Sequence, residues 1–581
     1  MADNELVLLD QELDNMQNDF GPAMNADRVF EFLACTQVLR EHGLSSDEVL
    51  AGIVGGGNDG AIDGVYVFLG DALLVEDSDS LLDDFSANKL PVGSTLTLNL
   101  VQAKRTPSFT ETAIDLVAGS TRRLLDLGQS EEDLGLYYSS ALISGVRPFR
   151  TALRKFGGRH LKVSIKFFYV TRGNVSSLNS KVKGKSTDLE AQFGEVIVNA
   201  SGSAQFLGAK QLWERHIAVP SYTLGLTCEE YSTSGNSHIA LVPIRDYLVF
   251  LRDETGALRR HIFDWNVRDY QGDVEVNREI RNSVLDEGLP EFWWLNNGVT
   301  IVCSKASITS KTFWLDDVQV VNGLQTSQTI FHAMVGKPDD HPSMDQKVLV
   351  RILKTGDDTK TRDQVIRATN RQTAVPAASL RATDDIQRKI EAFFLANDWY
   401  YDRRKNFYRN QGKSPARIVG IPLLAQGIMA MGLSRPDNSR ARPSSLLKRE
   451  VDYKKVFNPD LALEVYLWLA QTLKQVDSFL LTDAAGVNSS ERANLRFHLA
   501  MLAVGVIHGG RVYDPSQLAP LCSSKLDEGV LKICLTPLRE ALQKFSVEQD
   551  SSFDKAAKGP EFVNYLLDGV LPELVIQYSE A

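Results

Sequence analysis

Two runs of alternating apolar residues constrain the fold of this chain more than any other feature. They are AIDGVYVFL, residues 61–69, and LTLNLVQAK, residues 96–104. Side chains alternate between the two faces of a strand, so Gln102 and Lys104 share one face, and Asp63 shares a face with the valines that follow it. If the two strands are neighbours, Gln102 and Lys104 point toward Asp63.

This arrangement suits the hydrolysis of a phosphodiester. Asp63, helped by a backbone carbonyl of the second strand, offers hard oxygen ligands to a divalent cation, expected to be Mg²⁺ or Mn²⁺. The cation polarises the phosphate and lowers the pKa of a water, while Lys104 orients the water or balances negative charge. The pattern therefore predicts a metal-dependent endonuclease.

At these residues the chain resembles the Mrr-like branch of the PD-(D/E)xK restriction-endonuclease-like superfamily, which tolerates glutamine at the middle position. The resemblance implies that Asp63 and Lys104 are the core catalytic pair and that Gln102 replaces the usual acidic residue. It also implies a catalytic glutamate on the first helix, for which Glu31 is the matching residue. A neutral Gln102 contributes less to cation binding than a carboxylate, and a chance match to this short pattern is the open alternative.

A glycine fingerprint lies across the same region. Gly55, Gly57 and Gly60 satisfy GxGxxG, but the next residues form an apolar strand. A dinucleotide site needs a helix at that point, with its amino terminus facing the pyrophosphate. We therefore exclude a dinucleotide-binding fold.

Composition limits the other function classes. The 581 residues are enough for two or three cores, and the net charge of -11 argues against indiscriminate binding to nucleic acid. The five cysteines have no CxxC spacing, which excludes a zinc ribbon or a disulfide framework. The acidic amino terminus and the lack of a long apolar run predict a cytoplasmic protein without a membrane segment.

The periodicities predict an α/β protein in three parts. Residues 1–220 form a restriction-endonuclease-like domain, residues 221–375 a mixed α/β domain, and residues 376–581 a mainly helical region. In the middle domain, FWWLNNGVTIVC (residues 292–303) predicts a strand, a tight turn and a strand. VQVVNGLQTSQTIFHAM (residues 318–334) predicts a strand, a turn and a helix.

These two middle segments, followed by RILKTGDDTKTRDQVIRATNRQTAV at residues 351–375, resemble the AIPR family, named for abortive infection phage resistance. The resemblance spans about residues 220–440. It implies antiviral defence against phage or other foreign DNA. Members of the family often carry a nuclease-like domain in front, which reinforces the interpretation of Asp63 and Lys104.

The turn before the predicted helix of the middle domain is a candidate ligand site. Free N–H groups and the helix dipole at a helix amino terminus favour an anion such as phosphate. The arrangement also resembles, more distantly, the DGQHR and ParB-like folds, some of which bind nucleotides, and this resemblance implies a nucleotide as the ligand. Side chains further along the chain add donors. The candidate ligand-binding residues are Asn322, Gly323, Gln325, Thr326, Arg367, Asn370 and Arg371. A well-capped turn without a ligand is the alternative.

The segment WYYDRRKNFYRNQGKSPAR, residues 399–417, interleaves basic and aromatic side chains. Such side chains neutralise phosphates and stack on unpaired bases, which makes this segment the best local candidate for a nucleic-acid surface. Its candidate residues are Arg403, Arg404, Lys405, Tyr408 and Arg409. The alternative is that the aromatic residues belong to a core and that the charges pair with acidic neighbours.

The leading hypothesis is an anti-phage endonuclease whose substrate is nucleic acid, with DNA expected. The AIPR and helical regions hold it inactive until a nucleotide or a phage-derived trigger binds, and a homodimer would suit cleavage of both strands. The alternative is a catalytically weak or inactive defence protein that binds nucleic acid or senses a nucleotide.

Overall fold

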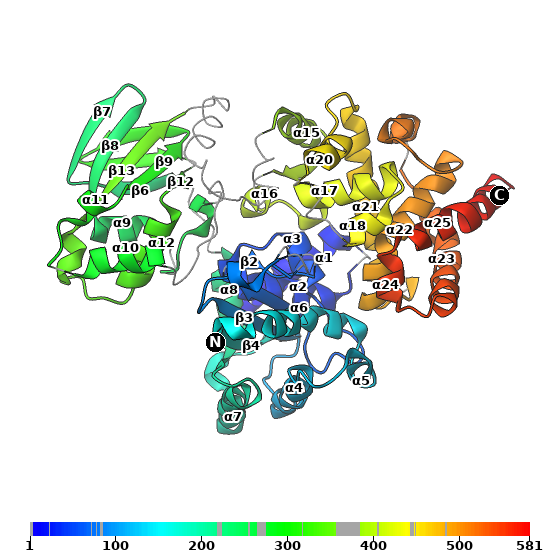
Figure 1. The fold of residues 1–581 in the computed structure, drawn as a ribbon, viewed down its shortest axis with the longest axis horizontal. Helices are drawn as coiled ribbons and strands as arrows, with labels where there is room; N and C mark the ends of the chain where they lie inside the picture. The colour runs from blue at the N-terminus through cyan, green and yellow to red at the C-terminus, as the bar shows by residue number, and fades with distance from the viewer. Residues whose placement is uncertain are drawn as a thin grey trace.

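The predicted class, α/β with a mainly helical carboxy-terminal region, is confirmed by the computed structural model (Figure 1). The structure describes residues 4–580, except 22–23, 71, 77, 79, 82–84, 218–222, 254–255, 264–274, 287, 317, 356–383, 404–405, 442–446, 448, 483–484 and 524. None of the described helices is long and apolar enough to cross a bilayer. All five cysteines are free thiols, as their spacing predicts.

The amino-terminal part is built on one mixed sheet with the strand order β2-β1-β3-β4-β5. β1 and β3 are antiparallel, whereas β3, β4 and β5 run parallel. The strands are β1 (Gly64–Leu69), β2 (Ala72–Leu73), β3 (Thr95–Lys104), β4 (Lys162–Thr171) and β5 (Ser201–Leu207). The helices are α1 (Asn4–Phe20), α2 (Ala26–Val38), α3 (Ser46–Ala51), α4 (Glu111–Leu124), α5 (Glu131–Gly135), α6 (Ser140–Phe156), α7 (Ser180–Val196) and α8 (Ala209–Ile217).

Helices cover both faces of this sheet, so β3 is buried along almost its whole length. Leu98 and Leu100 pack in one apolar layer with side chains of α4, α6 and α7. Val101 and Ala103 point the other way, into a layer formed by α1, α2 and α8. The alternation of LTLNLVQAK therefore fills two cores, and the polar Gln102 and Lys104 fall near the end of the strand.

The two strands that carry the nuclease-like pattern are neighbours, as the sequence analysis required. Gly64 pairs with Val101, so Asp63, one residue before β1, lies opposite Gln102. The amide of Asp63 donates to the carbonyl oxygen of Val101 at 2.8 Å, which fixes this register.

The middle part combines two sheets, with the strand orders β12-β9-β13-β8-β7 and β10-β11-β6. Its strands are β6 (Thr223–Thr227), β7 (Glu230–Ser234), β8 (Ser237–Pro243), β9 (Val299–Cys303), β10 (Lys305–Thr309), β11 (Thr312–Asp316), β12 (Gln319–Asn322) and β13 (Lys347–Lys354). Its helices are α9 (Ile244–Leu251), α10 (Glu275–Leu285), α11 (Phe292–Leu295) and α12 (Leu324–Met334). The strand, turn and helix predicted for residues 318–334 are confirmed as β12 and α12.

The first strand predicted in FWWLNNGVTIVC is wrong, because Phe292–Leu295 forms the single-turn helix α11. Only Phe292 is buried in the core, while Trp294 is 65% exposed, so the aromatic run has no buried face along a strand. The turn that follows does need its glycine: Gly298 has φ +74°, and a Cβ there would clash with the carbonyl oxygen of Leu349.

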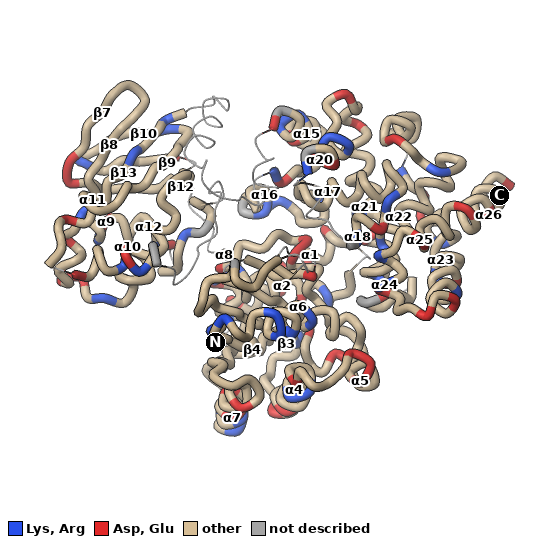
Figure 2. The backbone as a smooth tube through the Cα atoms, viewed as in Figure 1, with Lys and Arg blue, Asp and Glu red and all other residues tan. Residues whose placement is uncertain are grey.

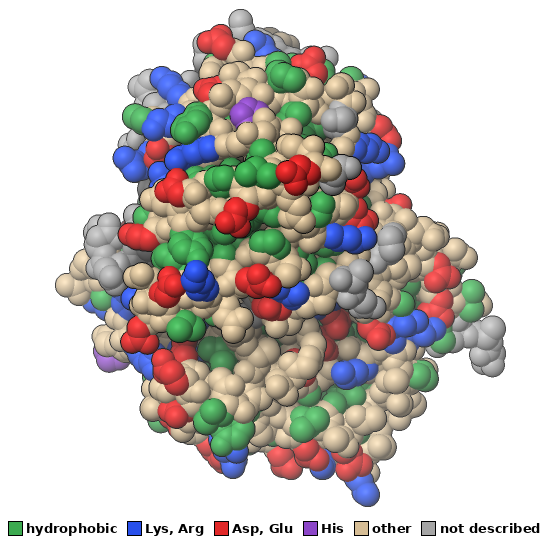
Figure 3. All heavy atoms as spheres, turned by 90° about the vertical axis from the view of Figure 1, so that its right-hand side faces the viewer, with side chains coloured by type: hydrophobic (Ala, Val, Ile, Leu, Met, Phe, Trp, Pro, Cys, Tyr) green, Lys and Arg blue, Asp and Glu red, His purple; other side chains and the backbone are tan. Residues whose placement is uncertain are grey.

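The carboxy-terminal part is a helical assembly around one large apolar core, with the small parallel pair β14 (Tyr400–Asp402) and β15 (Ile418–Gly420). The predicted long helices are confirmed as α21 and α22, and α22 ends at two glycines, Gly509 and Gly510. The helices are α15 (Asp385–Ala396), α16 (Phe407–Asn410), α17 (Ile421–Gly427), α18 (Pro436–Ala441), α20 (Glu450–Val456), α21 (Leu463–Leu481), α22 (Ser489–His508), α23 (Glu528–Glu548), α24 (Phe553–Ala557), α25 (Pro560–Tyr565) and α26 (Leu571–Glu580). Figure 3 shows that basic, acidic and apolar side chains are interspersed on one face of this assembly.

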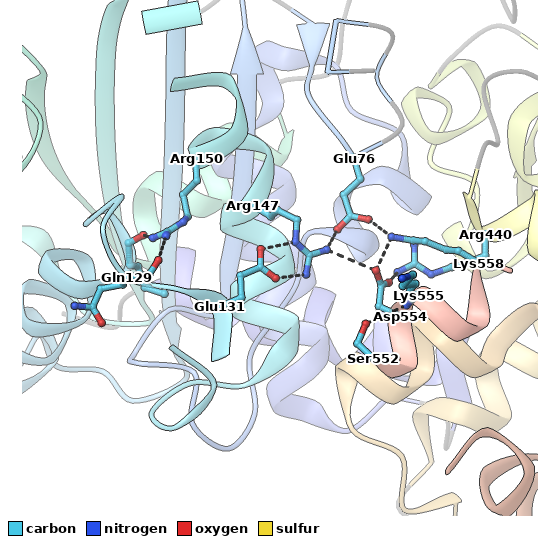
Figure 4. A network of polar contacts seen from close by, with 11 residues as sticks. Glu76, Gln129, Glu131, Arg147, Arg150, Arg440, Ser552, Asp554, Lys555 and Lys558 are labelled. Carbon is cyan, nitrogen blue, oxygen red and sulfur yellow. Dashed lines mark hydrogen bonds and ion pairs between the residues drawn. The ribbon is translucent and has the colours of Figure 1, made fainter. Parts of the chain in front are cut away.

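An ion-pair network joins the helical part to the amino-terminal part (Figure 4). We call this set of side chains the interface network: Glu76, Glu131, Arg147, Arg440, Asp554 and Lys558. Arg147 of α6 bonds to both carboxylate oxygens of Glu131 at 2.8 Å and also to Glu76. Lys558 lies 2.7 Å from Asp554 and also bonds to Glu76, so charges from both parts of the chain neutralise one another.

Candidate functional site

The loop between α3 and β1 is shaped by its own polar side chains. The carboxylate of Asp59 accepts hydrogen bonds from the amides of Gly56 at 3.1 Å and Ala61 at 2.9 Å. Gly60 has φ +61° and packs against Ser120, so a side chain at this position would be strained and would clash. The glycines therefore serve a tight loop before a strand, in agreement with the exclusion of a dinucleotide site.

Asp63 is held at the end of this loop, buried with 3% of its surface exposed. Its Oδ2 accepts two hydrogen bonds from β3, one from the amide of Ala103 at 2.7 Å and one from Gln102 Nε2 at 2.5 Å. Its backbone carbonyl accepts from the amides of Val54 and Gly55. The second carboxylate oxygen, Oδ1, is thereby left as the atom of Asp63 that can bind a ligand.

Glu31 faces the same point from α2, which is the second helix of the chain and not the first, because Asn4–Phe20 already forms α1. A Cβ added to Gly55 would lie 2.9 Å from Asp63 Oδ1 and 3.1 and 3.2 Å from the two carboxylate oxygens of Glu31. Gly55 thus keeps open a small space between two carboxylates that come from different elements. The structure brings together Glu31, Asp63 and Gln102, which the sequence analysis named as site residues.

Arg28 also belongs to this site, although the sequence analysis did not name it. Its Nη1 lies 3.0 Å from Glu31 Oε2 and 3.3 Å from the carbonyl oxygen of Gly55, and its Nη2 lies 3.3 Å from that of Ile53. Arg28 therefore ties α2 to the glycine loop and orients Glu31. The spacing of three residues between Arg28 and Glu31 on one helix was a signal available in the sequence.

Burial makes both carboxyl groups weaker acids, and the charge of Glu31 adds to this effect at Asp63. Burial, with the charge of Glu31 as the next cause, raises the pKa of Asp63 to about 7. Burial also raises the pKa of Glu31, against the opposing charge of Arg28. Two carboxylates that repel each other in a buried place are a typical environment for a bound cation, which would remove both penalties.

Lys104 ends β3 and is exposed to solvent. Its positive charge acts on both Asp63 and Glu31, where it favours the ionised carboxylates. In the part of the chain that the structure describes, the side chain of Lys104 makes no hydrogen bond or ion pair. Its ammonium group is therefore free to bind an anion next to the two carboxylates.

The residues fit a hard divalent cation by the chemistry of their oxygens. Asp63 Oδ1 and Glu31 supply carboxylate oxygens, and the amide oxygen of the buried Gln102 has no hydrogen-bond partner. Oxygen donors of this kind are what Mg²⁺ and Mn²⁺ prefer. Among the described residues, however, no group of three or more His, Cys, Asp and Glu side chains is arranged to hold a metal ion. Gln102 adds an oxygen to the two carboxylates but no charge.

The candidate anion site of the middle part is only partly described. Gly323, with φ +94°, precedes α12, Asn322 is exposed at the end of β12, and Thr326 is buried. Gly323, the N-cap residue, has no side chain with which to cap this helix amino terminus, and Gln325 is half-buried in the first turn of the helix. The remaining candidates, Arg367, Asn370 and Arg371, lie outside the described residues. Ligand binding at this turn stays a prediction.

The basic and aromatic segment of residues 399–417 is mostly internal. Arg403 is buried and pairs with Glu391 at 2.9 Å, and the hydroxyl of Tyr408 donates to the same carboxylate at 3.2 Å. Arg409 donates to the carbonyl oxygen of Leu44 at 2.7 Å. Arg404 and Lys405 lie outside the described residues. This placement favours the alternative in which these side chains stabilise the fold, and nucleic-acid binding by the segment stays a prediction.

One part of the chain is similar to a known protein family. Residues 263–503 match the model of the AIPR protein family. The resemblance predicted for about residues 220–440 is confirmed over residues 263–440. The match begins later than predicted and extends further, through most of α22. Neither the comparison with curated proteins nor that with solved structures gives a match.

The AIPR match covers the turn at Asn322 and the segment of Arg403 and Tyr408, but it does not include Asp63 or Lys104. The nuclease-like assignment of the amino-terminal part therefore stays a prediction that depends on the geometry of its site. Lys and Arg residues are distributed over all parts of the chain (Figure 2), so the charge pattern along the chain does not by itself select one part for nucleic acid.

Proposed function

We propose that this protein is an anti-phage defence nuclease that hydrolyses phosphodiester bonds at the site of Asp63 and Glu31 with the help of Mg²⁺ or Mn²⁺. The observation that carries the proposal is the convergence of these two carboxylates on Gly55, where the positive charge of the exposed Lys104 acts on both of them. A divalent cation bound there would supply Lewis-acid polarisation of the phosphate and would acidify a water.

The side chains around the proposed cation have distinct roles. Asp63 Oδ1 and Glu31 would hold the cation, and Gln102 positions Asp63 through the hydrogen bond at 2.5 Å. Arg28 fixes Glu31 and the loop of Gly55 in place. Lys104 would bind a phosphate oxygen and stabilise the negative charge that develops on it.

The defence role is supported by the AIPR match of residues 263–503. Free cleavage of DNA would harm the host, so a gated enzyme is expected. The matched region contains α21 and most of α22, and α21 contacts the amino-terminal part through Lys474, whose Nζ lies 2.9 Å from Asp47 Oδ1 in α3. A trigger that shifts these helices would reach the elements that flank the candidate site.

A second function is favoured by Gln102. Because its amide group donates to Asp63 rather than adding a charge, the site has two carboxylates instead of three. A protein with a weak cation site would still bind nucleic acid through Lys104 and neighbouring donors. It would then be a defence protein that binds nucleic acid or senses a nucleotide without cutting.

One experiment separates these functions. Full-length protein is incubated with duplex DNA, single-stranded DNA and RNA in Mg²⁺, Mn²⁺ or EDTA, and products are resolved on gels. We expect cation-dependent cleavage that falls by about 100-fold or more in Asp63→Asn and Lys104→Gln. Lys305→Gln, a change of an exposed lysine in β10, is the matched control and should cut normally. A Lys104→Gln protein that cuts at the wild-type rate refutes the assignment, and retardation without cutting supports the second function.

A further inference from the structure

Helices α21 and α22 of the AIPR-matched region pack against the elements that flank the candidate site. Lys474 of α21 pairs with Asp47 of α3 at 2.9 Å, and Leu481 at the end of α21 packs against the apolar layer that contains α2 and Ile53. α3 leads directly into the loop of Gly55. The interface network anchors further carboxy-terminal helices to α6 (Figure 4). The end of α21 therefore lies next to the elements that flank the candidate site.

Arg492 lies in the first turn of α22 and is half-buried. In the part of the chain that the structure describes, its guanidinium makes no hydrogen bond or ion pair. Arg496, one turn further along the same helix, donates to both carboxylate oxygens of Asp477. The two arginines lie on one face of α22 and differ in their surroundings. Arg496 is neutralised by the carboxylate of Asp477, whereas Arg492 pairs with no carboxylate among the described residues.

Arg496 of α22 pairs with Asp477 of α21, so Arg492, one turn nearer the start of α22, lies toward Leu481, which packs against the layer of α2 that carries Glu31. Burial and then the positive charge of Arg28 lower the pKa of Arg492, while the carboxylates of Asp477 and Glu31 act in the opposite direction. A guanidinium stays charged in proteins, and a partly buried charge without a partner is unfavourable. Arg28 is already bonded to Glu31 and to two carbonyl oxygens. Among the arginines that the structure describes at this junction, Arg492 is therefore one that is available to an anionic ligand.

We propose that Arg492 binds a phosphate group of the nucleic-acid substrate, so that the AIPR-matched region supplies a substrate-binding residue to the amino-terminal site. The inference rests on the proposed function, because it takes the substrate to be a phosphodiester bound at Asp63 and Glu31. A planar guanidinium donates two parallel hydrogen bonds to the non-bridging oxygens of a phosphate. Lys104 would approach the same backbone from the end of β3.

The test measures binding without cleavage. Affinity of the full-length protein for a short fluorescein-labelled DNA duplex is determined by anisotropy in EDTA over a range of salt concentrations. We expect Arg492→Gln to weaken binding about 10-fold and to lower the slope of log K against log salt by about 1. Arg492→Lys, which keeps the positive charge, should retain most of the affinity and most of the salt dependence. Arg281→Gln changes an exposed arginine of α10 and should leave both unchanged.

The outcomes distinguish this inference from the proposed function. If the wild-type protein cleaves DNA but Arg492→Gln binds with wild-type affinity and slope, the inference is overturned and the function stands. If the wild-type protein never cleaves but binding depends on Arg492, the nuclease function fails and the phosphate contact stands. Hydrogen exchange of residues 488–496 in the wild-type protein gives a second measurement in case Arg492→Gln misfolds. Protection of this segment by the duplex supports the contact, and unchanged exchange overturns it.

Discussion

Replacing Asp63 by asparagine should make the cation-free protein more stable while it abolishes the response to cations. Asp63 is buried beside Glu31, and its pKa is raised to about 7. An asparagine side chain would keep an oxygen to accept the hydrogen bonds of Ala103 and Gln102, and its amide group would donate toward Glu31. The substitution removes a buried, repelled charge and leaves the shape of the site unchanged.

The magnitude follows from proton linkage. The folded-state pKa of Asp63, about 7, lies above its ordinary value of 3.8, so between these values the folded state binds more protons than the unfolded state. The stability contributed by protonated Asp63 is fully present below about pH 4 and is lost as the pH rises through about 7. The difference between the two pKa values corresponds to a loss of roughly 4 kcal/mol above pH 7 and about 2 kcal/mol near pH 5. The increase in the free energy of unfolding caused by Asp63→Asn should follow the same pH dependence.

Thermal unfolding of full-length wild type and Asp63→Asn in EDTA, from about pH 5 to about pH 8, measures the increase in stability. Hydrogen exchange of the peptides that contain β1 and β3 assigns it to this site. Addition of Mn²⁺ should stabilise the wild-type protein at high pH, because the cation binds the folded state and replaces the proton, and it should not stabilise Asp63→Asn.

Asp437→Asn is the matched control. Asp437 is also buried, but both of its oxygens bond to Arg435, so its replacement should destabilise the protein at high pH. Our explanation of the site is refuted if Asp63→Asn is less stable than the wild type at about pH 8, or if its response to Mn²⁺ equals that of the wild type. Either result would mean that Asp63 is not a repelled carboxylate awaiting a cation.

Three further predictions concern the space between the carboxylates, the interface network and the basic segment. Gly55→Ala should abolish Mn²⁺ stabilisation, because its Cβ would enter the space between the two carboxylates, whereas Gly57→Ala, with open space around its Cβ, should not. Arg147→Gln should speed hydrogen exchange in α24 by weakening the interface by about 1–3 kcal/mol, because it leaves the hydrogen-bonded carboxylates without their partner. Lys532→Gln, which breaks one exposed pair within α23, should cost less than about 0.5 kcal/mol and leave α24 unchanged. Arg409→Gln should lower the free energy of unfolding by about 1–3 kcal/mol without weakening DNA binding. Weaker DNA binding at unchanged stability would instead support the basic segment as a nucleic-acid surface.

The local sequence was sufficient to predict the strands of the candidate site. The period of two in LTLNLVQAK encodes both apolar layers of β3, so its face assignment followed from the residues alone. The position of Asp63 opposite Gln102 needed only that β1 and β3 be neighbours. Local patterns also predicted β12, α12 and the long helices, because each has a periodic apolar face or a glycine stop.

The rest depends on contacts between distant parts of the chain. The aromatic run at Phe292 looks like a strand until the core shows that only one of its rings is buried. Arg409 looks like a surface residue until the carbonyl of Leu44 accepts its hydrogen bond. Gly55 acquires its role only when α2 brings a second carboxylate against it, and Arg492 reaches the site only through the packing of α21 and α22. The spacing of apolar residues along the sequence does not predict such tertiary contacts.

The charges at the site lead to one more consequence. Arg28 and Glu31 neutralise each other, and Asp63 is only partly ionised near neutral pH because its pKa is about 7. Lys104 and the proposed phosphate ligand Arg492 then give the cation-free site an excess of positive charge. A phosphate backbone would bind such a site without any cation, and the cation would be required for hydrolysis alone. DNA affinity in EDTA and cleavage in Mg²⁺ are therefore expected to respond to different residues. Loss of Asp63 should end cleavage and spare binding, and loss of Arg492 should weaken binding first.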